Sequence, residues 1–241
     1  MSDAPEFRPL GVDGILVRFA RVLTKEANAQ ALGFRDAVEA ATIAGVVEIA
    51  SSLTSVRVAF DPVKTDRATL LAQLQKVAAS LDVESTGPKR IWHIPVCFAP
   101  EYAPQLAEAA NLAGQTEQQA IADITGRTVR VIAIGFAPGQ PYLGMLPAHW
   151  DIPRQSALTE SLPHGALIVA VRQLIIWAAE APTGWRHIGQ SAFQVYRPGA
   201  PDPFAFAPGD AVRFHQVGQP EMAGFAANPD PDGGGKCEVL M

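Results

Sequence analysis

Residues 135–147 restrict the fold more than any other stretch of the chain. They follow an apolar, β-type run that ends at Ile134, and they contain three glycines, three prolines and two aromatic residues. Proline fixes φ and has no N–H, while glycine opens conformations that other residues avoid. The stretch therefore cannot be a helix or an inner strand, and we expect a shaped loop with bare backbone near Gly139 and Gly144. Spacing alone favours a structural turn that packs Tyr142, with a pocket-lining loop as the alternative.

The first ninety residues alternate between strand and helix patterns. Apolar and polar residues alternate at 14–20, 46–51 and 55–60, and helical periodicity appears at 24–41 and 66–81, with Thr24 and Asp66 as candidate N-caps. A further strand is expected at 89–98. The order strand, helix, strand, strand, helix, strand is typical of the ferredoxin-like arrangement.

The remainder of the chain has a different pattern. Two short helices are expected at 101–113 and 116–124, followed by short strands at 129–134, 166–171, 174–178, 193–196 and 211–216 with Gly and Pro between them. Many short strands with turn signals indicate an antiparallel sandwich or barrel. The segment 226–236 is rich in Asn, Pro, Asp and Gly, which predicts a flexible tail.

Composition excludes several classes of protein. The net charge is −5 and the Lys and Arg residues are scattered, which argues against nucleic-acid binding. No apolar run reaches the length of a membrane span, the first residues do not form a signal peptide, and the cytoplasm is the expected compartment. The two cysteines are far apart and the five histidines show no ligand spacing, so no metal site is expected.

No familiar catalytic motif is present, but two later stretches combine Gly and Pro with polar residues. In residues 182–191, His187, Gln190 and Ser191 could offer hydrogen-bonding groups to a ligand; a loop held by Trp185 in the core is the alternative. Residues 206–214 contain Pro208-Gly209, which suits the centre of a type II turn, and Asp210, which can bond the turn backbone.

Taken in order, these stretches resemble one family. The pattern Gly-Phe-x-Pro-Gly-x-Pro-Tyr-Leu-Gly-x-Leu-Pro, then Gly-Trp-x-x-Ile-Gly, then Pro-Gly-Asp-x-Val-Arg-Phe, is similar to that of the carboxyltransferase-type C/D family. Its members are called the B-type component of 5-oxoprolinase, kinase-A inhibitor or allophanate hydrolase subunit 1. The resemblance implies an α+β protein: a ferredoxin-like α/β domain at 1–88, a cyclophilin-like antiparallel β-barrel with two short helices at 89–217, and a flexible tail at 218–241.

The resemblance also implies a function. The family's best-supported role is as one subunit of an ATP-dependent 5-oxoprolinase, which opens the lactam of 5-oxo-L-proline to give L-glutamate. The partners would be a C-type subunit and a third, A-type subunit, with ATP used in the complex and no activity expected of the chain alone. The alternatives are a non-catalytic regulator that binds a histidine kinase, or a subunit of a urea- or allophanate-type amidohydrolase with another substrate.

The chain departs from the family pattern at one stretch above all. Where the family has Gly-Gly-Gln-Thr-Gly, this chain has Val171-Arg172-Gln173-Leu174-Ile175, so only the glutamine is kept. Added side chains would crowd a site where backbone approached a ligand. The family pattern also has a His where this chain has Ile124 and an Arg where it has Thr159, and Arg172 would restore one of these positive charges. The resemblance thus indicates a divergent member with an altered or lost site on an intact scaffold.

Our hypothesis for the substrate-binding site combines the stretches that carry the resemblance. Gln173 and Ser191 would hydrogen-bond the substrate, Arg154 would neutralise a carboxylate or phosphate, and Gly139 and Gly144 would let backbone N–H groups face it. The complete set of predicted substrate-binding residues is Gly139, Tyr142, Gly144, Arg154, Gln173, Trp185, Gln190 and Ser191. No catalytic residue can be nominated from spacing.

Overall fold

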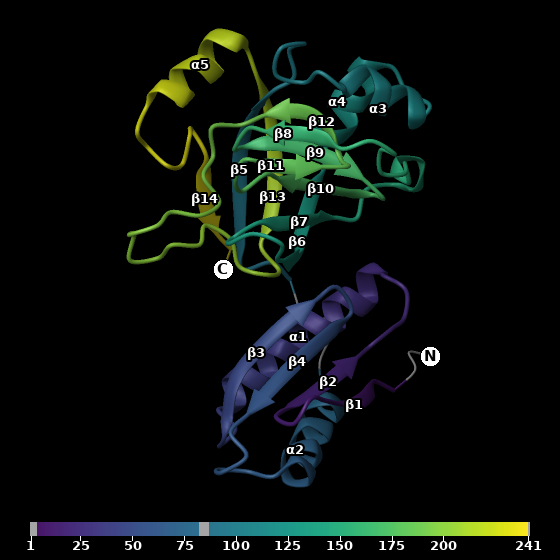
Figure 1. Ribbon diagram of the computed structural model, residues 1–241, viewed down its shortest axis with the longest axis vertical. Helices are drawn as coiled ribbons and strands as arrows, with labels where there is room; N and C mark the ends of the chain where they lie inside the picture. Colours follow the sequence, from purple (N-terminus) through teal and green to yellow (C-terminus); the bar gives the residue numbers. More distant parts are fainter. Residues whose placement is uncertain (1–3, 82–86, 241) are drawn as a thin grey trace. The chain divides into compact units, whose positions relative to one another are not determined.

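The computed structural model describes residues 4–81 and 87–240. The chain divides into two compact units, Met1–Gly87 and Pro88–Met241. Each unit is described by itself. Figure 1 gives the labels of their helices and strands.

The first unit is a four-stranded antiparallel sheet with two helices. Its elements are β1 (Glu6–Leu10), β2 (Gly14–Arg18), α1 (Lys25–Ala41), β3 (Val46–Ser52), β4 (Ser55–Phe60) and α2 (Arg67–Ala79), and the strand order is β1-β2-β4-β3 (Figure 1). Both predicted N-caps are confirmed. The Thr24 side chain accepts a hydrogen bond from the N–H of Ala27, and the Asp66 side chain accepts one from the N–H of Thr69. The helices bury Phe34, Leu70 and Leu74 against the sheet.

The connectivity of this unit differs from the expectation at one strand. The run expected to supply the last strand, 89–98, forms β5 of the second unit, and β1 pairs with β2 instead. The sequence 6–10 holds Pro9 and two charged residues, so it lacks a strand pattern. It forms a strand because the short turn at 11–13 brings it back along β2, where it becomes an edge strand that tolerates proline.

The second unit contains a closed barrel. Its elements are β5 (Arg90–Cys97), α3 (Leu106–Leu112), α4 (Glu117–Thr125), β6 (Thr128–Ile134), β7 (Pro141–Gly144), a 3-10 turn η1 (Ala148–Trp150), β8 (Thr159–Leu162), β9 (Ala166–Ala170), β10 (Gln173–Ile176), β11 (Ala181–Thr183), β12 (Arg186–Gln190), β13 (Ala211–Val217), α5 (Gln219–Ala227) and β14 (Lys236–Val239). The barrel strands follow the order β6-β13-β5-β12-β9-β10-β7, and β7 pairs with β6 to close the ring.

The barrel is mixed, which corrects the expectation of an antiparallel one. β13 runs parallel to β5, with Phe214 opposite Ile94. Parallel neighbours cannot be joined by a tight hairpin, and here the whole of the barrel sequence separates the two strands. The strand expected at 193–196 is also absent; Tyr196 makes only an isolated bridge to Phe204.

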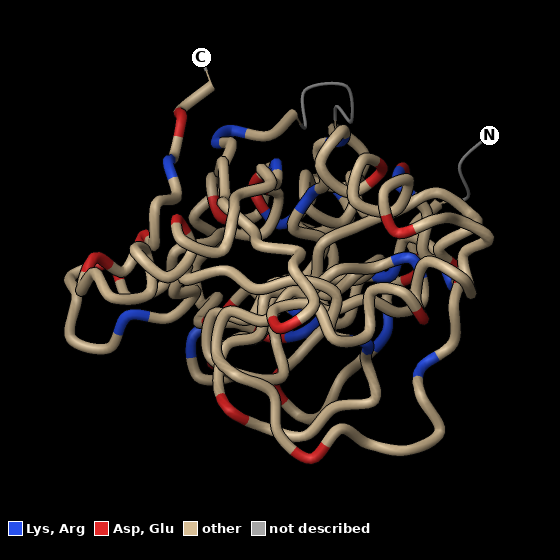
Figure 2. Tube along the Cα trace, turned by 90° about the horizontal axis from the view of Figure 1, so that it is seen from above, with Lys and Arg blue, Asp and Glu red and all other residues tan. Residues whose placement is uncertain are grey.

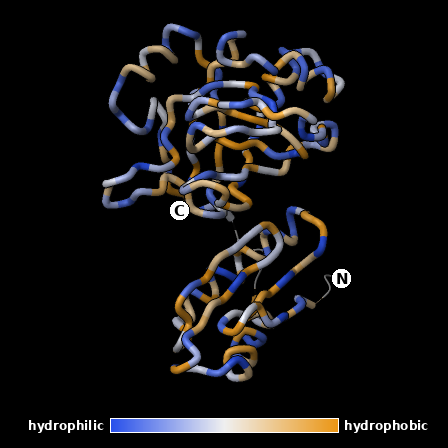
Figure 3. The backbone as a smooth tube through the Cα atoms, viewed as in Figure 1, coloured by the Kyte–Doolittle hydropathy of each residue, from blue (hydrophilic) through white to orange (hydrophobic). Residues whose placement is uncertain are grey.

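Four of the barrel strands, β7, β9, β10 and β12, bury nearly all of their residues on both faces. Side chains such as Val131, Leu143 and Val169 fill the interior, and Figure 3 shows the hydrophobic character of these strands. A second cluster, including Ile168, Ile175 and Trp185, covers the outer face of β7, β10, β9 and β12. We call this surface the outer wall. The separate two-stranded sheet β8–β11 contributes Leu162 and Ala181 to its cover.

The segment after residue 217 is folded rather than a flexible tail. It forms α5, which buries Met222, and β14, whose Lys236 lies opposite His93 of β5. The glycines of the segment allow this packing, since Gly233 approaches the backbone of Ala192 and Phe193. Composition alone could not reveal that β5 would pair with this segment.

Charged residues of both signs are scattered along the described chain (Figure 2). Within the described ranges, none of the helices combines the length and the apolar character that crossing a membrane requires.

Candidate functional site

Three of the predicted site residues lie together at one corner of the outer wall. Tyr142 and Gly144 belong to β7, and Gln173 begins β10. Because Leu174 is opposite Leu143, Gln173 stands beside Gly144. A Cβ built on Gly144 would lie 3.6 Å from Cγ of Gln173 and 3.0 Å from Cδ1 of Ile132. Gly144 is itself buried, so its position beside Gln173 has no room for a side chain.

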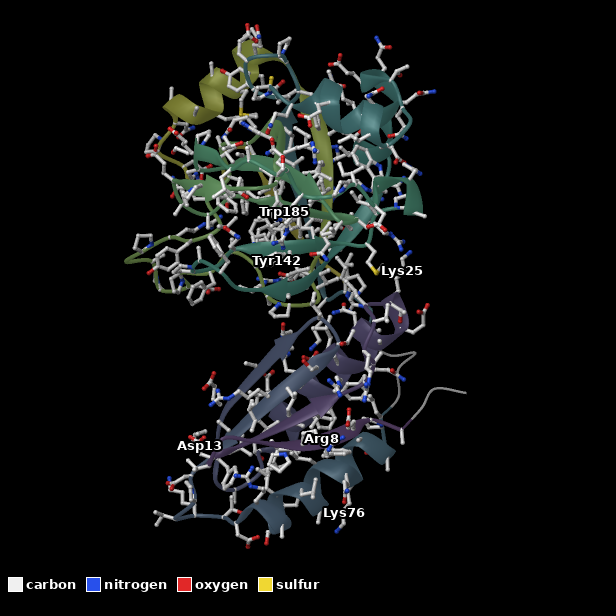
Figure 4. The ribbon with its side chains drawn as sticks, turned by 45° about the vertical axis from the view of Figure 1, so that its right-hand side comes forward. Arg8, Asp13, Lys25, Lys76, Tyr142 and Trp185 are labelled. Carbon is white, nitrogen blue, oxygen red and sulfur yellow. The ribbon has the colours of Figure 1, made fainter. Side chains whose placement is uncertain are left out.

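Trp185 and Arg154 lie beside these three residues, and we call the group of five the corner. The rings of Tyr142 and Trp185 meet edge to face with centroids 6.1 Å apart (Figure 4), and the guanidinium of Arg154 lies 5.4 Å above the Trp185 ring. Trp185 is buried, whereas Arg154 is exposed. Within the described residues Arg154 makes no ion pair, so its guanidinium donors are available to an anion. A guanidinium stacked on an indole is also held in one orientation.

Gln155 explains why Arg154 stays beside Trp185. The backbone N–H of Gln155 donates to the carbonyl of Gly184 at 2.7 Å, and its side-chain Nε2 donates to the carbonyl of Trp185 at 3.0 Å. Its Oε1 accepts from Nε2 of Gln105 at 2.6 Å. The segment on either side of Arg154 is thus bound to the start of β12 by a shared network.

The β9–β10 turn forms the far edge of the corner. Val171 and Arg172 are its two central residues, with φ values of 44° and 64°. A two-residue hairpin of this type needs positive φ at both positions, which is why the family pattern has two glycines there. Nε of Arg172 donates to the carbonyl of Leu146 at 2.9 Å, which fixes its side chain beside the segment after β7. This neutral acceptor leaves the guanidinium charged, so the restored positive charge stays a prediction.

The other three predicted residues lie elsewhere. Gly139 faces the backbone of Val195, and a Cβ there would lie 2.6 Å from that carbonyl oxygen. Gln190 donates from Nε2 to the carbonyl of His164 at 2.7 Å. Ser191 is buried, and its hydroxyl accepts the N–H of Phe193 at 3.1 Å.

Three polar side chains are buried on the outer wall, and the sequence had singled out one of them, His187, as a possible hydrogen-bonding group. Gln140, Trp177 and His187 are all nearly inaccessible to solvent. Burial lowers the pKa of His187, so its imidazole is neutral near pH 7. The Gln190 carboxamide is near enough to oppose this shift, although the two side chains do not meet in hydrogen-bond geometry. No sequence signal marks Gln140 or Trp177, because each is a single side chain in or beside a short strand.

The corner is suited to binding rather than to covalent chemistry. It presents a cation, a carboxamide and a phenol, which together match a small polar molecule that carries a carboxylate or a phosphate. Among the described residues, no group of three or more His, Cys, Asp or Glu side chains is arranged to hold a metal ion.

Comparison with known sequences shows the family. The family described as carboxyltransferase domain, subdomain C and D, matches residues 5–206, and the chain belongs to it. The chain is 25% identical over 234 residues to the B subunit of 5-oxoprolinase from Bacillus subtilis strain 168, covering 91% of this chain and 96% of that protein. It is 32% identical over 125 residues to the B subunit of 5-oxoprolinase from Escherichia coli O157:H7, covering 52% of this chain and 57% of that protein.

Solved structures agree with the fold. The crystal structure of TTHA0988 matches 85% of this chain with a TM-score of 0.73 and 29% identity, and this chain spans 40% of that longer chain. The urea amidolyase of Kluyveromyces lactis matches 98% of this chain with a TM-score of 0.72, over 16% of its own length. Its identity of 14% shows a shared fold alone.

Proposed function

We propose that this chain is a B-type subunit of an ATP-dependent complex that opens the lactam of 5-oxo-L-proline to L-glutamate. The complex would contain a C-type and an A-type subunit and work in the cytoplasm, and the chain alone would be inactive. The observation that carries the proposal is the match to the B subunit of the Bacillus subtilis 5-oxoprolinase over 96% of that protein's length. Such coverage leaves no domain of that relative without a counterpart here.

The corner of the outer wall supports this substrate. Arg154 would bind the carboxylate of 5-oxoproline, and the Gln173 carboxamide would pair with the lactam, to which it is chemically complementary. Tyr142 and Trp185 would contact the ring.

ATP does not fit this corner. A triphosphate needs several cations or a series of backbone N–H groups, and the corner offers one guanidinium. Among the described residues, the sequence also lacks a strand–glycine-rich loop–helix phosphate motif. We therefore assign nucleotide binding to the partner subunits and derive no step through ATP from this chain.

Two finer points of the fold belong to the same proposal. The barrel would be of the cyclophilin-like kind, and the first unit would be a ferredoxin-like variant in which β1 replaces the last strand, with the boundary near residue 88. The solved structures of the family offer a direct superposition to check both.

The proposal is tested by reconstitution. The chain is mixed with its C-type and A-type partners, and ATP-dependent release of glutamate from 5-oxoproline is measured. The matched control contains the B subunit of Bacillus subtilis with its own partners. Turnover in the control without turnover in the reconstituted complex would refute the proposed function.

A further inference from the structure

β14 has a strand partner on one edge only. It pairs antiparallel with β5, with Lys236 opposite His93 and Val239 opposite Arg90, and among the described strands no other lies beside it. All of its residues are exposed, and Figure 1 shows β14 beside β5 at the side of the barrel. A strand edge with unpaired N–H and C=O groups is a template for pairing with another strand. The outer edge of β14 can therefore accept a further strand.

The backbone bonds to β5 determine which groups of β14 point outward. The N–H of Leu240 donates to the carbonyl of Lys89 at 2.8 Å, and this pair continues the register of β14 on β5. In an antiparallel ladder, residues that bond to one neighbouring strand alternate with residues that face the other way. The even-numbered residues of β14 therefore bond to β5, whereas Cys237 and Val239 direct their N–H and C=O groups to the outer edge.

The sequence of β14 makes this edge self-complementary. A second copy can add antiparallel about a two-fold axis at Cys237, so that the outward groups of the two Cys237 residues bond one another. Lys236 of each copy then lies opposite Glu238 of the other, on the same face of the sheet. Val239, which is 72% exposed, lies opposite Gly235, which has no side chain to obstruct it.

The charges also select this register over its neighbours. The adjacent registers that keep the same backbone bonding place Lys236 opposite Lys236, or Glu238 opposite Glu238, and like charges directly opposite one another are destabilising. Among the described residues Lys236 makes no ion pair, and Glu238 has one contact of this kind, with Oε2 3.6 Å from Nε2 of His93. The Glu238 side chain is 64% exposed. Both charges can therefore reach a second copy.

We propose that two copies of this chain associate through β14, with Lys236 of each copy against Glu238 of the other. The partner is a second copy because one short edge carries both charges at the spacing that a two-fold axis requires. The pairing joins two strands of 4 residues, so the interface is small and the dimer forms at high protein concentration. The inference does not depend on the proposed function, because it concerns association of this chain with itself.

The test measures the mass of the full chain in solution by analytical ultracentrifugation as the protein concentration is raised. We expect a monomer–dimer equilibrium for the wild type. Lys236→Glu and Glu238→Lys each place like charges opposite one another, so each should raise the dissociation constant at least about tenfold. Glu160→Lys, a charge reversal at an exposed residue of β8, is the matched control and should leave the dissociation constant unchanged.

The double variant Lys236→Glu, Glu238→Lys separates the proposed register from a general effect of charge. It exchanges the two charges, so each copy again has an opposite charge across the axis. Its dissociation constant should return to within about threefold of the wild-type value. A surface elsewhere on the chain would not respond in this way.

Cys237 provides a second readout that leaves both charges in place. In the proposed dimer the two Cys237 Cα atoms are about 5.5 Å apart, as in other hydrogen-bonded antiparallel pairs. A short bis-maleimide should join two wild-type chains at this residue, and Glu238→Lys should give less of the linked dimer at the same protein concentration. Cys237→Ser should give none, because the other cysteine, Cys97, is buried.

Three outcomes would overturn the inference. They are a wild-type chain that stays monomeric up to about 1 mM, single variants that associate as strongly as the wild type, and a double variant that associates no more strongly than the single ones. The wild-type measurements require no variant, so a folding defect in one of them does not remove the test. These failures are distinct from an absence of turnover in the reconstituted complex, because the readout is the mass of this chain alone.

Discussion

Leu146 and Arg172 are joined by two hydrogen bonds. The N–H of Leu146 donates to the carbonyl of Arg172 at 2.8 Å, and Nε of Arg172 donates to the carbonyl of Leu146 at 2.9 Å. The N–H groups of Val171 and Arg172 donate to Ile152 and Trp150 at 2.9 and 3.0 Å. The β9–β10 turn is thereby fixed to the segment that leads to Arg154, which couples the position of Arg154 to that of Gln173.

The turn itself gives the first prediction. Val171 is β-branched and adopts a φ of 44°, which costs an L-residue about 1–2 kcal/mol. Val171→Gly removes this strain and adds about 0.5–1 kcal/mol of chain entropy to the unfolded state, so we expect a net stabilisation of about 0.5–1 kcal/mol. Urea unfolding followed by tryptophan fluorescence reports on the second unit, because all four tryptophans belong to it.

The control for this variant is Val195→Gly at a position without positive φ. Val195 is buried in the barrel core, so its loss should destabilise the second unit. A decrease in the urea midpoint for Val171→Gly would show that the turn is not strained.

Gly144→Ala is expected to impair the proposed complex without unfolding the barrel. The new methyl would lie 3.0 Å from Ile132 Cδ1 and 3.6 Å from Cγ of Gln173, so Ile132 would have to shift and the Gln173 side chain would be crowded. We expect kcat/KM to fall about tenfold, with a loss of stability below about 1–2 kcal/mol. Gly224→Ala in α5 is the control, since a Cβ there meets no atom within 4 Å. Equal activity of the two variants would place the substrate elsewhere.

Arg154→Ala should affect substrate binding much more than stability. The side chain is exposed and contributes about 0.5–1 kcal/mol through its contact with Trp185. If it binds the substrate carboxylate, KM for 5-oxoproline should rise about tenfold or more with kcat nearly unchanged. Arg21→Ala, another exposed arginine, should leave KM as it is. A fall in kcat alone would argue against a binding role.

Asp210→Asn should strongly destabilise the barrel. The buried Asp210 carboxylate accepts from Nε and Nη2 of Arg90 at 3.1 and 2.6 Å, and from the N–H of Ala207 at 2.8 Å. Loss of the charge leaves the Arg90 guanidinium without its anion, at an expected cost of about 2–4 kcal/mol. Glu180→Gln provides an exposed control that keeps a partner in Ser161. Similar urea midpoints for the two variants would contradict this interpretation.

Acidification should weaken the second unit through two histidines. Burial lowers the folded-state pKa of His164 and His187 below the ordinary value of 6.5. Below pH 6.5 the unfolded chain therefore binds more protons than the folded chain, and the free energy of unfolding falls as the pH decreases. In the double variant His164→Gln, His187→Gln, the free energy of unfolding should fall less between pH 7 and pH 5, as measured by urea unfolding followed by tryptophan fluorescence. If it falls as much as in the wild type, these histidines are not the source of the pH dependence.

Local features were largely predictable from the sequence. Thr24 and Asp66 act as caps, and Asp210 bonds the backbone of its own turn, because each of these interactions depends on residues within three positions. Segments without a local pattern were missed. β1 contains a proline and β14 follows three glycines, and each exists only because a strand edge in its own unit accepts it.

The site divides in the same way. The order of the Gly- and Pro-rich stretches in the sequence was enough to indicate the family, since these turns require specific backbone angles whatever surrounds them. The register of the strands decides which residues are in contact. Gln173 of β10 lies beside Gly144 of β7, while the Ser191 hydroxyl accepts a hydrogen bond from the N–H of Phe193. The parallel β5–β13 pair likewise joins the two ends of the barrel sequence. Such pairings join residues far apart in the chain, so no local preference encodes them.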